Sequence, residues 1–264
     1  MTPLVRKELR DQRRGLLGWS GGLAAMVLMY SSFWPSVRDN ASQFESYLEN
    51  LPDAMRNVIG ELSLGTPVGY LQSELFSFLG PALILVLAIG AGARSLAGEE
   101  ELGTMDLLAA APIARGRIVI EKFAAMSVTA IAIGAALWLA TVSIGRAFGL
   151  DVPPANVAAA TLHLVLLGIA FGAFAQLLGA WSGRRTLSIA LSASVAVGTF
   201  LLDAFAPAVE GLDWAARLSP FYYYGENVPL QEGLQVGHAL VLVAIAAVCL
   251  VLSILAFDRH DIHA

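Results

Sequence analysis

Ser20 comes closest to a known catalytic pattern, because it lies in the run Gly18-Trp19-Ser20-Gly21. A serine nucleophile needs a histidine within hydrogen-bond reach to accept its proton. The four histidines of the chain are His163, His238, His260 and His263. The first two are predicted below to lie toward the membrane face opposite Ser20, and nothing in the sequence orients the other two. A serine hydrolase is therefore not expected.

The chain also lacks the common sequence motifs that bind nucleotide phosphates or metal ions. A Walker-type phosphate loop needs a lysine directly after a glycine, and neither lysine of the chain, Lys7 or Lys122, follows one. The motif His-Glu-x-x-His is absent, and a single cysteine, Cys249, permits neither an intrachain disulfide nor a cysteine-based zinc site. We therefore expect no enzyme activity and no cofactor or metal on this chain. Any ATP-driven work requires a second polypeptide.

The composition indicates which elements position these side chains. Of the 264 residues, 57% are hydrophobic and 14% are charged, against about 25% charged in a soluble domain. Six runs are almost free of charge and long enough to cross a bilayer as helices. They occupy residues 16–35, 75–97, 123–145, 156–181, 187–206 and 238–257. The sequence predicts an all-α polytopic membrane protein, with six transmembrane helices in a single transmembrane domain, 1–264.

Basic residues predict the orientation of these helices, because cytoplasmic segments carry an excess of Lys and Arg. One set of segments holds twelve of the 16 basic residues: Arg6, Lys7, Arg10, Arg13, Arg14, Arg94, Arg115, Arg117, Lys122, Arg184, Arg185 and Arg259. The opposite set holds Arg38, Arg56, Arg146 and Arg217. We therefore place both termini in the cytoplasm and the long segments 36–73 and 203–237 outside. With a net charge of −5, the chain offers no basic surface for nucleic acid.

The N-terminal segment 1–15 has the spacing of an amphipathic helix. Its basic residues follow one helix face: Arg6, Lys7, Arg10, Arg13 and Arg14. A helix of this kind lies in the headgroup plane with its cations near anionic lipid. We interpret these residues as an interfacial anchor. A basic flank with no role beyond orienting the first span remains the alternative.

The segment 98–115 has the pattern of a short capped helix after an acidic run. The acidic residues are Glu99, Glu100 and Glu101, followed by Gly103, Thr104, Met105, Asp106, Leu107, Leu108 and Pro112. Gly103 is expected to break the preceding helix, Thr104 to cap a new one and Pro112 to limit it. A helix of about eight residues is marginal in water and needs a partner to pack against. An ordinary capped turn between two spans is the alternative.

At these residues the chain resembles the integral-membrane permease subunit of bacterial ATP-binding-cassette exporters, type-2 class. The resemblance includes Arg115 after the proline, the basic N-terminus, the six spans and the outer run Leu218-Ser219-Pro220-Phe221-Tyr222-Tyr223. It implies that the helix around 104–111 is a coupling helix that docks on a separate ATPase subunit. It also implies a location in the bacterial plasma membrane, a second permease copy as partner, and ATP and Mg²⁺ held by the ATPase.

The function expected from this resemblance is export of a hydrophobic or amphipathic substrate, such as a drug, lipid or peptide. A secondary transporter driven by an ion gradient is an alternative, but it would need ionisable residues near the bilayer midplane. A membrane anchor or sensor without transport is a third hypothesis. His163 and Gln176, both in the fourth predicted span, are better placed for hydrogen bonds between helices than for catalysis.

Overall fold

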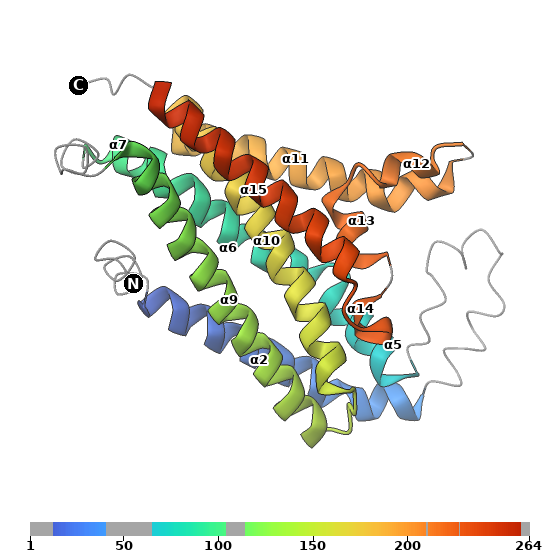
Figure 1. The fold of residues 1–264 in the computed structure, drawn as a ribbon. Coiled ribbons are helices and arrows are strands. Elements are labelled where there is room, and N and C mark those ends of the chain that lie inside the picture. Colours follow the sequence, from blue (N-terminus) through green and yellow to red (C-terminus); the bar gives the residue numbers. More distant parts are fainter. Residues whose placement is uncertain (1–12, 41–64, 104–113, 210, 227, 260–264) are drawn as a thin grey trace.

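The computed structural model describes residues 13–40, 65–103, 114–209, 211–226 and 228–259 (Figure 1). Of these residues, 87% are helical and none lies in a strand. Six helical segments are long and apolar enough to cross a membrane, which confirms the all-α fold with six candidate spans. They are Arg13–Asp39, Pro67–Glu101, Arg115–Ala147, Pro154–Ser182, Arg185–Ala208 and Val236–Arg259. Each charge-poor run of the sequence lies inside one of these segments.

The first segment is the single helix α2 (Arg13–Asp39), whereas the second is built from five consecutive pieces. These are α5 (Pro67–Leu71), the π-helical turn η1 (Gln72–Phe76), α6 (Leu79–Ala93), the π-helical turn η2 (Arg94–Gly98) and α7 (Glu99–Glu101). The third and fourth segments are α9 (Arg115–Ala147) and α10 (Pro154–Ser182). π-Helical turns are rare and often occur at functional sites. One of them lies at each end of α6.

The fifth segment is α11 (Arg185–Phe205) with the short 3-10 helix η3 (Ala206–Ala208), and the sixth is α15 (Val236–Arg259). Between them lie three short helices, α12 (Asp213–Ala216), α13 (Pro220–Gly225) and α14 (Pro229–Glu232). Asp203 lies in the last turn of α11, and the helix continues past it to Phe205.

Helix α10 forms the centre of the bundle and contacts α6, α9, α11 and α15 (Figure 1). Of its most apolar stretch 78% is buried, against 17% for that of α11. Small residues allow this close packing. A Cβ atom added to Gly92 of α6 would collide with the carbonyl oxygen of Gly172 of α10. The two backbones therefore meet directly at Gly92, within the run of small residues Gly90-Ala91-Gly92-Ala93.

Two aromatic residues join α2 to the start of the second segment. The rings of Trp34 and Tyr70 lie 5.2 Å apart, centroid to centroid. The Tyr70 hydroxyl donates a hydrogen bond of 2.9 Å to the carbonyl oxygen of Tyr30. These contacts fix the far end of the first span against α5.

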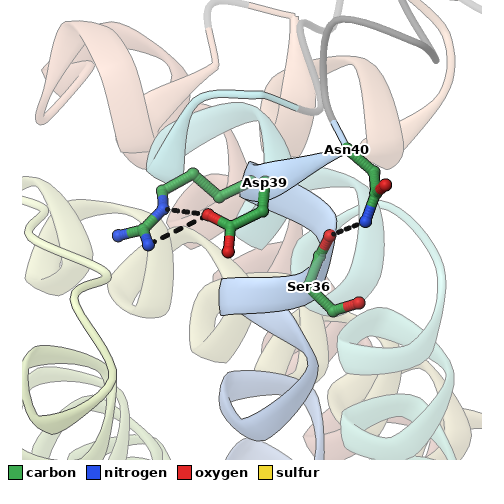
Figure 2. Close-up of polar contacts among 4 residues, drawn as sticks. Ser36, Asp39 and Asn40 are labelled. Atoms are coloured by element: carbon green, nitrogen blue, oxygen red, sulfur yellow. Dashed lines mark hydrogen bonds and ion pairs between the residues drawn. The ribbon is translucent and has the colours of Figure 1, made fainter.

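The end of α2 satisfies its own polar groups, as Figure 2 shows. The side-chain amide of Asn40 donates a hydrogen bond of 2.8 Å to the carbonyl oxygen of Ser36. The Arg38 guanidinium donates to Oδ1 of Asp39 at 3.1 Å. The last carbonyls of a helix lack intrahelical partners, so the Asn40 contact caps one of them.

Helix α2 begins, and α15 ends, at the same end of the bundle as α7 (Figure 1). We call this the glutamate end, after Glu99, Glu100 and Glu101. The short helices α12, α13 and α14 lie toward the opposite end.

Candidate functional site

Glu99 of α7 forms an ion pair with Lys122 of α9. The distance from Oε1 of Glu99 to Nζ of Lys122 is 2.6 Å. The lysine exposes 6% of its side chain and the glutamate 26%. A charge with so little contact with water requires an opposite charge close by. The pair therefore attaches the end of the second segment to α9.

Glu101 and Glu100 lie against the junction between α10 and α11. Oε1 of Glu101 accepts a hydrogen bond of 2.9 Å from the backbone N–H of Arg185, the first residue of α11. The first N–H groups of a helix lack intrahelical acceptors and carry partial positive charge, so a carboxylate there is stabilising. Gly183 ends α10 with a left-handed φ of +62°, and a Cβ there would lie 2.8 Å from Oε2 of Glu100. The turn thus requires glycine both for its backbone and for the space that Glu100 occupies.

These contacts change the interpretation of the acidic run. The sequence presents the three consecutive glutamates only as the start of the segment 98–115. In the structure, Glu99 is paired with a lysine and Glu101 accepts a hydrogen bond from a backbone N–H group, so the run first of all attaches α7 to α9 and α11. Sequence reasoning did not assign Lys122, Gly183 or Arg185 to this site. Lys122 carried a signal, since it is one of two lysines and borders an apolar run.

The residues after the acidic run are described only in part. Helix α7 ends before Gly103, whose φ of +67° is left-handed, as a helix break requires. Arg115 is the first residue of α9. The other residues of the predicted coupling segment lie outside the described residues: Thr104, Met105, Asp106, Leu107, Leu108 and Pro112.

The predicted interfacial anchor is likewise described only at its end. Arg13 and Arg14 are exposed in the first turn of α2, at the glutamate end. Arg6, Lys7 and Arg10 lie outside the described residues. A second ion pair lies near the start of α9, at the glutamate end. In it, Nε of Arg117 lies 2.9 Å from Oε1 of Glu121.

The polar residues inside the fourth span make hydrogen bonds to other segments. Nε2 of Gln176 donates to the carbonyl oxygen of Val119 on α9 at 3.0 Å. Nε2 of His163 lies 3.3 Å from the carbonyl oxygen of Gln235, just before α15. Both side chains are fully buried. The Gln176 contact confirms the prediction of a hydrogen bond between helices, whereas His163 contacts the chain just before α15.

No catalytic constellation forms around Ser20 within the described residues. Ser20 lies near the start of α2, at the glutamate end, whereas His238 lies near the start of α15 at the opposite end. The His238 ring contacts the rings of Tyr222 and Tyr223, with centroids 5.7 Å and 5.5 Å away. The described ranges also contain no cluster of three or more His, Cys, Asp or Glu residues that could hold a metal ion.

The outer motif around Ser219 is built into the bundle. The Ser219 hydroxyl accepts a hydrogen bond of 3.0 Å from the N–H of Phe221 and donates one of 2.9 Å to the carbonyl oxygen of Thr199 on α11. The Tyr224 hydroxyl donates to the carbonyl oxygen of Phe76 at 2.5 Å. Burial raises the pKa of Tyr224 above its ordinary value, so it remains a neutral donor. This motif therefore joins α13 to α11 and to the start of the second segment.

An apolar groove of about 460 Å³ lies between α6 and α11. Its walls include Val86, Ile89 and Gly90 from α6, Ala193 and Phe200 from α11, and Phe221 from α13. A groove of this size is within the range of about 300–1,000 Å³ that is typical of small-molecule sites.

A second cavity, of about 570 Å³, adjoins this groove toward the glutamate end. We call it the arginine cavity, because Arg94 and Arg185 line it together with Leu16, Trp19, Thr129 and Ile133. Val86 and Gly90 line both the groove and the arginine cavity. A Cβ atom added to Gly90 would meet no atom within 4 Å, so this glycine faces open space.

Residues 2–262 of the chain match the family model described as "ABC-2 family transporter protein". The match includes the six candidate spans, the acidic run and both cavities. Among individually curated proteins, no sequence matches the chain.

Proposed function

The chain belongs to the ABC-2 family of transporter proteins, and we propose that it is the permease subunit of an ATP-driven exporter. The proposed substrate is hydrophobic or amphipathic. A separate ATP-binding-cassette ATPase holds ATP and Mg²⁺ and supplies the energy. A second permease copy, identical or related, completes the pathway.

One observation carries this proposal, namely that the acidic run is attached to two further spanning helices. Glu99 is paired with Lys122 of α9, and Glu101 is bonded to the first N–H group of α11. The segment 98–115 starts from this attachment and returns to the described chain at the beginning of α9. A force applied to the segment by an ATPase therefore reaches α9 and α11 through these contacts, and α6 through η2 and α7.

The proposed orientation places the glutamate end in the cytoplasm of a bacterial cell, with the chain in the plasma membrane. Twelve of the 16 basic residues are assigned to this side, and cytoplasmic segments carry such an excess. An ATPase bound at this end is exposed to the ATP of the cytoplasm. The exposed cations Arg13 and Arg14 at the start of α2 support an interfacial anchor there.

The proposed pathway follows the apolar groove between α6 and α11. The groove walls are apolar, which suits a hydrophobic or amphipathic substrate. Helix α11 is the least buried of the six candidate spans, and we propose that the second permease copy covers part of it. Because α6 continues into η2 and α7, displacement of the acidic run changes the width of the groove. ATP drives such a change only if the ATPase binds the two states with different affinity.

Purification of the chain from native membranes tests the proposed function. We expect an ATP-binding-cassette ATPase to copurify, and the reconstituted complex to hydrolyse ATP faster when substrate is added. Charge reversal of Glu100 or Asp106 should lower this stimulation about tenfold, which corresponds to about 1.4 kcal/mol of lost coupling. The same reversal at Glu232, an exposed carboxylate at the opposite end, is the control. Transport by the purified chain without an ATPase, or normal stimulation in both reversal variants, would contradict the proposal.

A further inference from the structure

Arg94 of η2 and Arg185 of α11 both lie close to Gly98 and line the same cavity. A Cβ atom added to Gly98 would lie 2.9 Å from Cγ of Arg94 and 4.0 Å from Cδ of Arg185. Two side chains from different spanning segments are thus brought together at the glutamate end. Both are exposed, so their charges are open to the cavity and its surroundings.

Neither guanidinium forms an ion pair within the part of the chain that the structure describes. The carboxylates of Glu99 and Glu101 have other partners. Glu99 is paired with Lys122, and Glu101 accepts its hydrogen bond from the backbone N–H of Arg185 rather than from its side chain. Two adjacent guanidinium groups that form no ion pair with a described carboxylate are suited to bind an anion. The planar guanidinium fork matches phosphate oxygens particularly well.

Apart from Thr129, the remaining walls of the arginine cavity are apolar or aromatic. They include Leu16 and Trp19 of α2, Val86 of α6 and Ile133 of α9. Tryptophan is enriched where the hydrocarbon of a bilayer meets the headgroups. An anion that is bound here has apolar surface directly beside its charged group, which is the environment that an amphipathic molecule needs.

The apolar groove extends this surface along α6. It shares Val86 and Gly90 with the arginine cavity and reaches Phe78. The helical rise from Gly90 to Phe78 is about 18 Å at 1.5 Å per residue. One leaflet of the hydrocarbon core is about 15 Å thick. The groove is therefore long enough to hold an acyl chain of one leaflet while a headgroup stays beside the arginines.

We propose that the arginine cavity and the apolar groove together bind an anionic phospholipid. Arg94 and Arg185 donate hydrogen bonds to its phosphate oxygens, and its acyl chain lies in the groove past Gly90. This inference rests on the proposed function in one respect, because it narrows the substrate class of the same pathway to anionic acyl lipids. Binding itself requires no ATPase.

Equilibrium binding to the purified chain in a neutral detergent tests the phosphate contact. We expect phosphatidylglycerol to bind at least about tenfold more tightly than phosphatidylcholine. The variants Arg94→Gln and Arg185→Gln should each weaken phosphatidylglycerol binding about tenfold, since a hydrogen bond to a charged group is lost. Arg184→Gln is the matched control, because it removes the same charge from the neighbouring position, which lines neither cavity. Equal loss in all three variants, or equal binding of both lipids, would overturn the proposal.

The acyl-chain part of the site has its own test. Gly90→Phe fills the space between the two cavities. Gly198→Phe adds the same ring on α11, at a glycine whose Cβ position also has no atom within 4 Å. We expect only Gly90→Phe to weaken binding of long-chain phosphatidylglycerol, with the same thermal unfolding temperature for both variants. Millimolar inorganic phosphate should not displace the lipid. Displacement by phosphate, or no effect of Gly90→Phe, would show that no acyl chain occupies the groove.

The two proposals fail in different ways. If an ATPase copurifies but phosphatidylglycerol binds no better than phosphatidylcholine, the lipid site is wrong and the exporter remains. If the lipid binds as expected but no ATPase associates with the chain, the exporter is wrong and the site remains. Stimulation of ATP hydrolysis by phosphatidylglycerol in the wild type, and its loss in Arg94→Gln and Arg185→Gln but not in Arg184→Gln, would support both.

Discussion

Nζ of Lys122 lies 2.6 Å from Oε1 of Glu99, and the lysine exposes only 6% of its side chain. Removing one partner from a buried ion pair leaves a charge that neither water nor protein compensates. The pair therefore fixes α7 against α9 at the point where the segment 98–115 begins. Glu99 keeps 26% of its side chain exposed, so water screens part of the interaction.

The first prediction concerns this pair. Lys122→Met should lower the free energy of unfolding by about 2 kcal/mol, less than the about 3–5 kcal/mol found for fully buried pairs. Glu99→Gln should cost more, because it leaves the charge of Lys122, the less exposed partner, without its carboxylate. Both residues also have other interactions, so a double-mutant cycle is needed to isolate their pairwise energy. Thermal unfolding of the chain in detergent measures each corner of the cycle.

The matched control for the cycle is the pair Arg146–Asp151 at the end of α9, whose side chains are 53% and 85% exposed. Exposed ion pairs contribute about 0.2–1 kcal/mol. Arg146→Met should therefore change the unfolding temperature very little. If Lys122→Met were as mild as Arg146→Met, the ion pair could not be the attachment between α7 and α9.

The second prediction contrasts two glycines that are two residues apart on α6. Gly92→Ala places a Cβ against the carbonyl group of Gly172 and should destabilise the chain by about 3 kcal/mol, because α6 and α10 must separate. Gly90→Ala meets no atom within 4 Å and should be neutral or stabilising by about 0.5–1 kcal/mol, since alanine favours a helix. Unfolding temperatures in detergent compare the two variants. Equal destabilisation would mean that α6 packs on α10 through another face.

The number of spans could be predicted from the sequence, because about 20 apolar residues are needed to cross a bilayer. The position of each span within the bundle could not. Helix α15 has the highest hydropathy, 3.1, but only 28% of that stretch is buried, whereas α10 has a hydropathy of 2.1 and is 78% buried. Lipid is as apolar as a protein interior, so hydropathy does not separate the central helix from those at the periphery.

The acidic run could be recognised in the sequence, but its partners could not. Glu99 and Lys122 are 23 positions apart, and Glu101 and Arg185 are 84 apart. Which helix ends meet depends on tertiary packing, and no local pattern records it. The same limit applies to Arg94 and Arg185, which the sequence presents only as basic residues flanking two different spans.

The third prediction concerns Tyr224, whose hydroxyl donates to the carbonyl oxygen of Phe76. Tyr224→Phe should lower the free energy of unfolding by about 1 kcal/mol at neutral pH, the typical net value of a buried hydrogen bond. Tyr222→Phe is the control, since the Tyr222 hydroxyl has no hydrogen bond to any described residue. A loss in Tyr222→Phe equal to that in Tyr224→Phe would contradict the assigned contact.

The pH dependence of Tyr224 follows from the direction of its pKa shift. Burial raises its pKa in the folded chain above the ordinary value of 10.0, so its stabilising contribution is complete below about pH 10. Above that pH the unfolded chain loses the proton first, and the contribution declines. The difference in unfolding temperature between wild type and Tyr224→Phe should therefore be constant from about pH 6 to about pH 9, because the phenol is neutral in both the folded and the unfolded chain over this range. It should shrink at higher pH.

The last prediction tests the proposed orientation. Cys249 is the single cysteine and is buried, so a Cys249→Ala background leaves no native thiol for labelling. Glu232→Cys in α14 and Arg184→Cys between α10 and α11 introduce exposed thiols at opposite ends of the bundle. With the glutamate end in the cytoplasm, a membrane-impermeant maleimide should label Glu232→Cys in intact spheroplasts and Arg184→Cys only after permeabilisation. The reverse pattern would place the acidic run outside the cell, where no ATPase could act on it. In that case both the coupling segment and the direction of transport proposed for this chain would be wrong.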